Sequence, residues 1–217
     1  MKILLSLLCT SFCLIGNLPS AAAAEGVQCG NLIYGGTQTS RCFSDEFLSA
    51  VQRETTIKTD RRFKSVKLAS EELFDFPFVV MTGESDFHLT AVERKHLKRY
   101  LENGGFLLAS AGCSSKKFDK AFRRELRRVF PEMDMVALPK SSPIFRTVYE
   151  IDELLLKSPV EEPELQALDL GGKTVVIYSS HGLNNTANAP GCCCCGGNEI
   201  KNSLEMNVNI LAYALLY

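Results

Sequence analysis

The feature of this chain that most constrains its fold is the alternation of continuous apolar segments with amphipathic ones. Apolar runs at residues 76–82, 106–110 and 173–178 are typical of strands buried on both faces of a sheet. Amphipathic segments at 90–103, at 116–130 and from about Glu199 predict helices that cover such strands. This order predicts an α/β domain with a mostly parallel central sheet and right-handed crossovers.

The segment that starts at Thr90 has the clearest boundaries of any predicted helix. Thr90 and Glu93 form a capping box, in which each side chain satisfies an unpaired amide of the first turn. Glycines at 104 and 105 end the helix. The expected apolar face consists of Val92, His96, Leu97, Tyr100 and Leu101. Weaker patterns predict strands at 31–34 and 62–68 and a helix from Ser44, whereas residues 133–170 show no regular pattern.

Composition narrows the classes of function. The chain has 217 residues, of which 46% are hydrophobic, and a formal charge of −1. It can therefore bury a core, and it presents no global basic field for nucleic acid or an anionic membrane. Residues 116–128 nevertheless carry seven Lys and Arg against two acids. We favour a solvated helix face here; the alternative is a docking surface for an acidic partner or an anionic polymer.

The first 24 residues predict a cleaved signal peptide. A lysine at position 2 precedes an apolar run from Ile3 to Gly16, and alanines at 22–24 supply the small residues that signal peptidase reads. We expect cleavage after Ala24 and export to the periplasm or the exterior, with no transmembrane segment left in the mature chain. An uncleaved signal anchor is the alternative. The remaining residues, 25–217, predict a single α/β domain.

Export would place the cysteines in an oxidising compartment, where disulfides are the default. Seven of the nine cysteines follow the signal peptide. Because seven is odd, at least one is a thiol, a metal ligand or half of an intermolecular bridge. The disulfide candidates are Cys29, Cys42, Cys113, Cys192, Cys193, Cys194 and Cys195. A bridge between Cys29 and Cys42 and bridges to the run at 192–195 both fit the sequence.

Polar residues directly follow the three apolar runs. Glu84 comes after the first, Cys113 after the second and His181 after the third. Ligands of open parallel sheets bind beyond the carboxyl ends of the strands. If these strands are parallel neighbours, the three residues share one edge with the cysteine run, and Cys113 lies within disulfide reach of a cysteine in that run.

The same residues suggest a metal or metal-cofactor site as one alternative. Two cysteines of the run, with Cys113 or His181, would supply thiolate and imidazole ligands. Four adjacent cysteines do not have the Cys-x2–4-Cys spacing of structural zinc sites, because neighbouring side chains point apart in extended backbone. Disulfide scaffolding is therefore the favoured interpretation of the run.

Several segments resemble the bacterial domain of unknown function 4159 family. They are Phe76–Gly83, Leu89–Thr90, Tyr100–Leu108, Phe122–Glu125, Val129–Pro131, Pro143–Phe145 and Asn207–Tyr213. The resemblance covers most of the chain after the signal peptide. This family is similar to class I glutamine amidotransferase-like domains, which implies a flavodoxin-like three-layer α/β sandwich and leaves the activity open.

The resemblance also raises Cys-dependent hydrolysis as a hypothesis. Such amidotransferases hold a nucleophilic Cys in a Gly-x-Cys-x-Gly turn and use a His-x-Glu pair. Here Gly112 directly precedes Cys113 and no glycine follows it, and His181 is followed by glycine and leucine. A dyad of Cys113 and His181, oriented by Glu84, would carry the reaction. A buried thiol or half-cystine at position 113 is the favoured alternative.

Three classes of function therefore stay open. We favour an exported, non-catalytic module that binds a small molecule or a protein partner at the carboxyl edge of its sheet. The second class is a thiolate metal or redox site built from Cys113, His181 and residues 192–195. The third is a divergent Cys-dependent amidotransferase-like hydrolase. A thiol count together with elemental analysis separates the three.

Overall fold

A computed structural model describes residues 26–217 except 37, 40–42, 159–162 and 185–198. The strands are β1 (Cys29–Tyr34), β2 (Gln38–Thr39), β3 (Lys64–Lys67), β4 (Phe78–Gly83), β5 (Phe106–Ala111), β6 (Val136–Ala137), β7 (Leu165–Leu170) and β8 (Lys173–Ser179). The α-helices are α1 (Glu46–Glu54), α2 (Ala91–Glu102), α3 (Lys116–Val129) and α4 (Ser203–Leu216). Short 3-10 turns cover Glu71–Asp75, Gly112–Ser114 and Pro143–Arg146.

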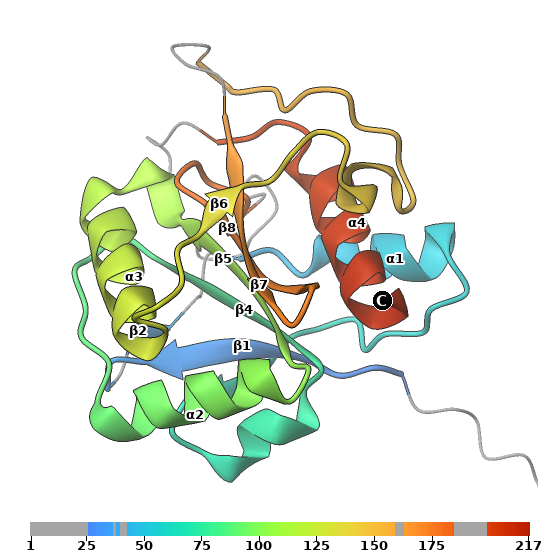
Figure 1. The fold of residues 1–217 in the computed structure, drawn as a ribbon. Coiled ribbons are helices and arrows are strands. Elements are labelled where there is room, and N and C mark those ends of the chain that lie inside the picture. Colours follow the sequence, from blue (N-terminus) through green and yellow to red (C-terminus); the bar gives the residue numbers. More distant parts are fainter. Residues whose placement is uncertain (1–25, 37, 40–42, 159–162, 185–198) are drawn as a thin grey trace, which may run out of the picture.

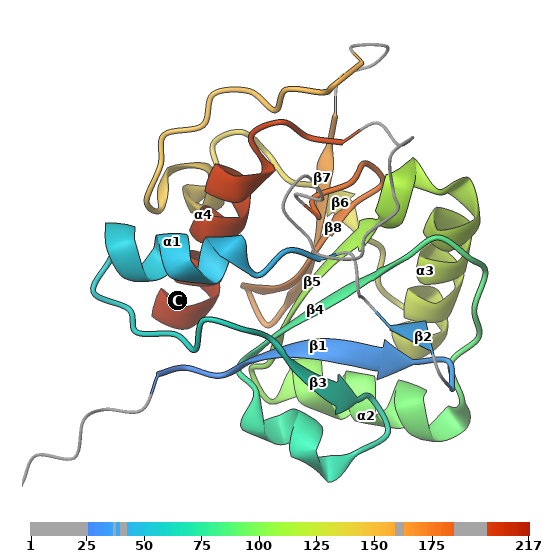
Figure 2. The same ribbon diagram turned by 180° about the vertical axis from the view of Figure 1, so that it is seen from behind.

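Within the described residues, eight strands form one mixed, mostly parallel sheet. β3, β1, β4, β5 and β8 lie side by side in that order and run parallel (Figures 1 and 2). β7 pairs antiparallel with β8 and with β6, and β2 pairs antiparallel with the end of β1. The mostly parallel sheet expected from the apolar runs is confirmed.

Helices cover both faces of the sheet, so the fold has three layers. α2 and α3 lie on one face, and α1 and α4 lie on the other, as the two opposite views show (Figures 1 and 2). Successive side chains of β4 alternate between the layers: Val79 and Met81 join the α2–α3 core, and Phe78 and Val80 join the α1–α4 core. Because both faces of such a strand are covered, its sequence is a continuous apolar run.

The amphipathic pattern of 116–130 correctly predicts α3. Phe118, Phe122, Leu126 and Val129 are all buried against the sheet. Each such side chain stabilises the fold by roughly 1.5–3 kcal/mol relative to an exposed position. The capping box of α2 is also confirmed, with both hydrogen bonds present. None of the described helices is long and apolar enough to cross a membrane.

Two expectations about helices are wrong. Val92 is 53% exposed, because α2 instead directs Glu93, Leu97 and Tyr100 toward the core. The Glu93 carboxylate folds back onto the Thr90 amide and takes the buried position in the first turn. α4 begins at Ser203 rather than near residue 199, because residues 199 and 200 form β-bridges with Gly182 and Leu156.

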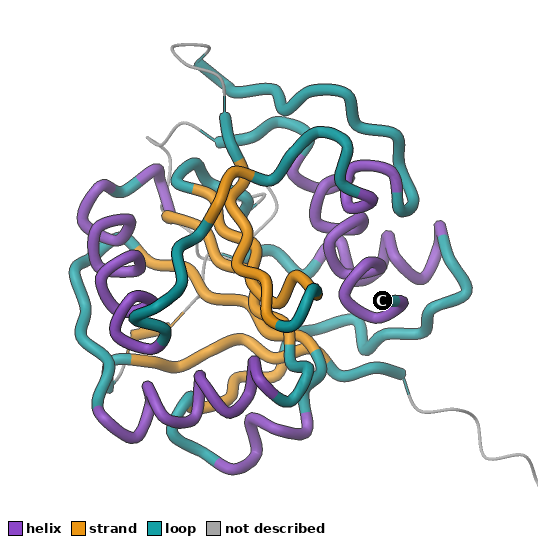
Figure 3. The backbone as a smooth tube through the Cα atoms, viewed as in Figure 1, coloured by secondary structure: helices purple, strands orange, loops and turns teal. Residues whose placement is uncertain are grey.

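The stretch at 133–170 is more regular than its sequence pattern indicates. It contains β6 and β7, and β7 forms a hairpin with β8 (Figure 3). Gly171 and Gly172 make the turn with positive φ angles of 58° and 83°, the conformation that two-residue hairpin turns require. This Gly-Gly pair is the hairpin signal that the sequence interpretation passed over.

Candidate functional site

The turn between β5 and α3 has an unusual backbone. Cys113 (φ 52°, ψ 28°) and Ser114 (φ 54°) both lie in the left-handed region, which costs a residue with a side chain roughly 1–2 kcal/mol. Ser115 ends the turn and caps α3, because its hydroxyl oxygen accepts the Phe118 N–H. We call residues 112–115 the Cys113 turn. This turn places a half-buried thiol where a strand joins a helix.

The Cys113 turn contacts the residue that follows the neighbouring strand. The Cys113 thiol donates to Glu84 Oε1 at a distance of 3.6 Å. The Ser115 hydroxyl donates to the Glu84 carbonyl oxygen at 2.5 Å. β4 and β5 are adjacent and parallel, with Gly83 level with Ala111. The structure therefore brings together Glu84 and Cys113, two of the residues that the sequence assigned to this edge.

Two glycines allow this close approach. A Cβ atom on Gly112 would lie 3.1 Å from the Gly83 carbonyl oxygen, and a Cβ atom on Gly83 would lie 2.3 Å from Tyr34 Oη. The Tyr34 hydroxyl donates to the Thr82 carbonyl oxygen at 2.8 Å. Burial raises the pKa of Tyr34, so the phenol stays neutral and keeps this bond. A larger residue at Gly112 would press the Cys113 turn against the end of β4, and one at Gly83 would clash with Tyr34 and Phe118.

Hydroxyl groups at the strand ends form buried hydrogen bonds at the same edge. Thr82 on β4 donates to the Ser110 carbonyl oxygen at 2.8 Å, and Ser110 on β5 donates to Asn184 Oδ1 at 2.6 Å. Ser179 at the end of β8 accepts the His181 N–H at 3.1 Å. All five residues are buried. These bonds fix the carboxyl ends of three neighbouring strands and the segment that follows β8.

Two buried amides have a polar atom without a hydrogen-bond partner among the described residues. One is Nδ2 of Asn184, and the other is Oδ1 of Asn207 on α4. The second amide already uses its nitrogen, which donates to the Leu183 carbonyl oxygen at 2.8 Å. An unpaired buried polar group costs about 1–3 kcal/mol. Each atom therefore marks a place where a polar atom of a water or a ligand is favoured.

The remaining candidates from the sequence fall into two groups. His181 is buried two residues beyond β8, the strand next to β5, and so lies at the expected edge. Cys42 and Cys192–Cys195 lie outside the described residues, so their disulfides and their proximity to Cys113 stay predictions. Among the described residues, no group of three His, Cys, Asp or Glu side chains is placed to hold a metal ion. The metal hypothesis thus depends on the cysteine run.

Cys29 lies at the other end of the sheet. As the first residue of β1 it is level with Phe106, whereas the Cys113 turn follows Ala111. That separation is about 17 Å along the strands, at ~3.3 Å per residue. Cys29 is a fully buried thiol, and burial, together with the charge of Asp60, raises its pKa to about 12. Cys29 is a core residue and not a member of the carboxyl edge.

α3 also contributes a buried carboxylate, Glu125, which contacts the loop between β4 and α2. The Glu125 side chain is 2% exposed and lies 2.8 Å from Arg128, 3.0 Å from Arg124 and 3.5 Å from Arg94. Burial by itself would raise the pKa of Glu125. Hydrogen bonds from Arg124 and the Leu89 N–H, with the charges of Arg128 and Arg124, lower it overall. Glu125 therefore stays charged at neutral pH and joins α2, α3 and the loop before α2.

Arg124 extends this cluster to the loop that begins with Glu84. Its guanidinium donates to Asp86 at 3.0 Å and to the Phe87 carbonyl oxygen. The other arginines of α3 also have acidic partners within the protein, which are Asp119, Asp134 and Glu125. This pairing favours a self-paired, solvated helix face over a docking surface. The sequence signal for Glu125 is a single acid among the apolar positions of a basic helix, and it was not among the predicted site residues.

The fold and this edge define an α/β protein with an open sheet and polar groups gathered beyond the carboxyl ends of its strands. The family described as "Domain of unknown function (DUF4159)" matches residues 29–215, a range that includes Glu84, the Cys113 turn and His181. The chain belongs to the DUF4159 family. A comparison with the curated proteins found no match.

Proposed function

We propose that this DUF4159 protein is an exported binding module whose ligand occupies the carboxyl edge of the sheet, against Glu84 and the Cys113 turn. The observation that carries the proposal is the strained turn itself. Two successive residues with side chains persist in the left-handed region only where the surrounding structure over-determines them, and such strain clusters at ligand-binding sites. Here the strained backbone sets a thiol beside a carboxylate.

The strand order supports the choice of edge. Numbered along the chain, the five parallel strands lie in the order 2-1-3-4-5, which is the order of flavodoxin-like proteins. The order reverses between β1 and β4, and ligands of doubly wound sheets bind at such a switch point. Glu84 directly follows β4. A flavodoxin-like sandwich of the glutamine amidotransferase-like kind is therefore part of the proposal.

The groups at this edge define the kind of ligand. Glu84 supplies a carboxylate acceptor, Asn184 an unpaired amide donor and Cys113 a weak donor. A small polar molecule with a cationic or N–H donor for Glu84 fits this set. The same chemistry on an exposed side chain would allow a protein partner to bind.

Disulfide tethering at Cys113 tests the proposal. The protein is equilibrated under mild reductant with small disulfides that carry ammonium, amide or methyl head groups, and the adducts on Cys113 are quantified by peptide mass mapping. We expect the ammonium head to be enriched at least about fivefold over the methyl head, a difference of roughly 1 kcal/mol. The enrichment should vanish in Glu84→Gln. Adducts on Cys113 without any head-group preference would contradict the proposal.

The same protein samples separate the two alternative classes. If zinc binds at one ion per chain and protects Cys113 from thiol reagents until a chelator removes it, that result would favour a thiolate metal site over the binding module. Turnover of an activated ester that is lost in Cys113→Ser would replace it with a Cys-dependent hydrolase. Inert behaviour in both assays, with selective tethering, supports the binding module.

Export is the second part of the proposal and rests on residues 1–24. We expect the mature protein, residues 25–217, to accumulate in the periplasm or outside the cell with Glu25 at its terminus. Cys42 and Cys192–Cys195 would then meet an oxidising compartment and form disulfides. The intact mass of the exported protein checks the cleavage site, and a terminus at Met1 would overturn this part.

A further inference from the structure

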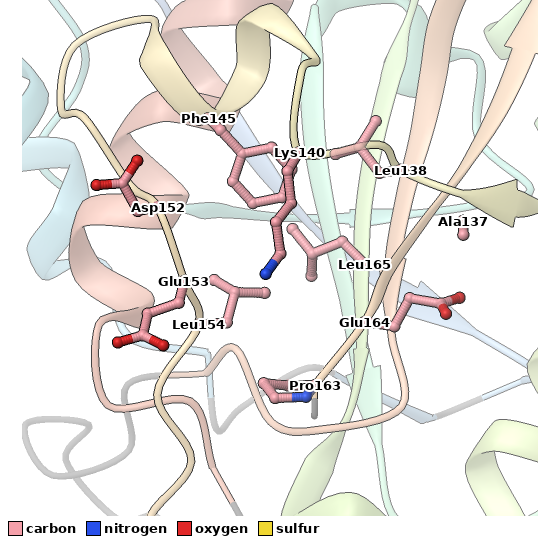
Figure 4. Close-up of a pocket in the computed structure, with 10 residues that line it drawn as sticks. All are labelled: Ala137, Leu138, Lys140, Phe145, Asp152, Glu153, Leu154, Pro163, Glu164 and Leu165. Atoms are coloured by element: carbon pink, nitrogen blue, oxygen red, sulfur yellow. The ribbon is translucent and has the colours of Figure 1, made fainter. Parts of the chain in front are cut away.

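A hollow of about 260 Å³ lies at the side edge of the sheet, between the β6–β7 pair and residues 152–154. Figure 4 shows one lysine and three acids on its walls, which are Lys140, Asp152, Glu153 and Glu164. These charges are mixed, and Arg146 already binds Asp152 at 3.2 Å. Such a lining selects no single chemistry of occupant. The buried polar groups behind the carboxyl edge of the sheet are more specific.

Three buried hydroxyl side chains lie level with one another at the carboxyl ends of neighbouring strands. Thr82 on β4 is in register with Ser110 on β5, and Ser110 is in register with Ser179 on β8. Each follows, two residues later, a side chain of the α1–α4 core: Val80, Leu108 and Ile177. Because side chains alternate between the two faces of a strand, the hydroxyls lie in the α1–α4 layer. This end of the layer is therefore polar, whereas its middle is apolar.

Two fully buried amides, those of Asn184 and Asn207, belong to the same polar end of the layer. Asn184 Oδ1 accepts the Ser110 hydroxyl at 2.6 Å, and the Asn184 carbonyl oxygen accepts the Ser44 N–H at 2.9 Å, just before α1. Asn207 lies on α4, and its side-chain nitrogen donates to the Leu183 carbonyl oxygen at 2.8 Å. Both amides are therefore fixed next to the peptide unit that joins residues 183 and 184.

The atoms that these two amides leave without a partner among the described residues are complementary. Nδ2 of Asn184 is a donor, and Oδ1 of Asn207 is an acceptor. By amide bond lengths, Oδ1 of Asn207 lies within about 5 Å of the Leu183 carbonyl oxygen that its nitrogen binds. The two atoms do not bond directly to each other. Buried polar atoms without a partner are rare in native proteins, so a donor and an acceptor in one place indicate a bound group that satisfies both.

We propose that one buried water molecule binds between Asn184 and Asn207 and links α4 to the segment after β8. The water accepts from Asn184 Nδ2 and donates to Asn207 Oδ1. Ser203, which is 2% exposed and lies one turn before Asn207 on the same face of α4, supplies the third of the hydrogen bonds that a buried water typically makes. A neutral molecule fits better than an ion, because the two amide atoms are one donor and one acceptor. The Asn184 nitrogen carries two N–H groups, so this site is independent of the ligand proposed for the carboxyl edge.

Cross-relaxation between water and side-chain amide protons tests the proposal by NMR on the full chain. We expect NOE and ROE peaks of opposite sign from water to the Asn184 and Asn207 amide protons, because a buried water stays in place for longer than the protein takes to tumble. Proton exchange with the solvent instead gives peaks of the same sign in both spectra. Asn209 is the matched control and should show no such peaks. It is buried on the same helix, and both of its amide atoms already bond to the backbone of residues 148 and 149.

Two variants assign the water to this pair of amides. Asn207→Leu removes the acceptor and should abolish the water peaks at Asn184, with the backbone amide shifts of β1 unchanged as a check of the fold. Ser203→Ala, a milder change, should weaken the peaks at Asn184 at least about twofold, because one of three hydrogen bonds is lost. Ser49→Ala, on the exposed side of α1, should leave them unchanged. The proposal is overturned if the wild type shows no peaks of opposite sign at Asn184 and Asn207, or if the Asn184 peaks keep their strength in Asn207→Leu. Should Asn207→Leu fail to fold, undiminished peaks in Ser203→Ala overturn it.

Discussion

Cys29 and Cys113 occupy opposite ends of the same sheet, and they differ in burial, backbone conformation and hydrogen bonding. Cys29 begins β1 in regular strand backbone, is fully buried and has a pKa raised to about 12. Cys113 follows β5 in left-handed backbone, is half-buried and donates to Glu84. The amino edge is built as core, whereas the carboxyl edge holds strain and polar groups. Whether a cysteine of this sheet is a core residue or a site candidate therefore depends on which end of a strand it occupies.

The most pronounced consequence of this comparison is a difference in thiol reactivity. We expect iodoacetamide to alkylate Cys113 at least about 100-fold faster than Cys29 in the native protein, because Cys29 reacts only after an opening of the core. Timed alkylation with peptide mass mapping measures both rates in one sample. The rates should become equal in denaturant, which is the control. Similar native rates would remove the distinction between the two edges.

Glu125→Gln tests how far the loop that follows β4 at the carboxyl edge depends on the charged cluster around Glu125. The change leaves Arg94, Arg124 and Arg128 without their shared carboxylate, and we expect a loss of about 2–3 kcal/mol in unfolding free energy, less than for fully buried pairs because the arginines are partly exposed. Hydrogen exchange should rise at residues 84–89 through local opening, whereas at 29–34 it should follow only the change in global stability. Urea unfolding and amide exchange measure the two effects. The exposed Glu132→Gln is the matched control, with a change within about 0.5 kcal/mol.

The same cluster predicts a dependence on pH. The folded pKa of Glu125 lies below its ordinary value of 4.5, so its contribution to stability is complete above that value and is lost as the pH falls through the folded pKa. Wild type should therefore lose more stability between about pH 5 and pH 3 than Glu125→Gln does. Equal losses in the two proteins would contradict the assignment of charge to this carboxylate.

The smallest expected effect is the change in unfolding free energy of Cys113→Gly, which should be opposite in sign to that of the matched Cys29→Gly. Cys113→Gly removes left-handed strain, and we expect a gain of about 0.5–1 kcal/mol in unfolding free energy after the greater freedom of glycine in the unfolded chain is counted. Cys29→Gly empties a buried strand position and should cost about 2 kcal/mol. Thermal and urea unfolding of both variants measure the pair. A loss of stability in Cys113→Gly would mean that the turn is not strained.

Most of the fold could be predicted because its signals are local. Continuous apolar runs identify β4, β5 and β8, and the Thr90–Glu93 capping box places the start of α2 within one residue. The hairpin of β7 and β8 was missed because β7 alternates weakly and its turn signal is only the pair Gly171-Gly172. Val92 was misplaced because one apolar residue at a helix start does not define the buried face.

The candidate site was predictable in part for a geometric reason. Glu84 and Cys113 needed only adjacent parallel strands to meet, and β4 and β5 provide them. The charged cluster around Glu125 depends on contacts between distant segments, such as Arg124 with Asp86 and Arg94 with Glu125. No periodic pattern in the sequence encodes such contacts.

We propose that the ligand binds at the carboxyl edge of the sheet and not at the amino edge. Amide chemical-shift mapping with a library of small polar fragments tests this proposal most directly, because the amides at both edges report in one experiment. We expect the largest shifts at Gly83, Glu84, Cys113 and Ser114, with the signals of Cys29 and its neighbours unchanged. Shifts that gather at the amino edge, or fragments that bind nowhere near the Cys113 turn, would contradict it.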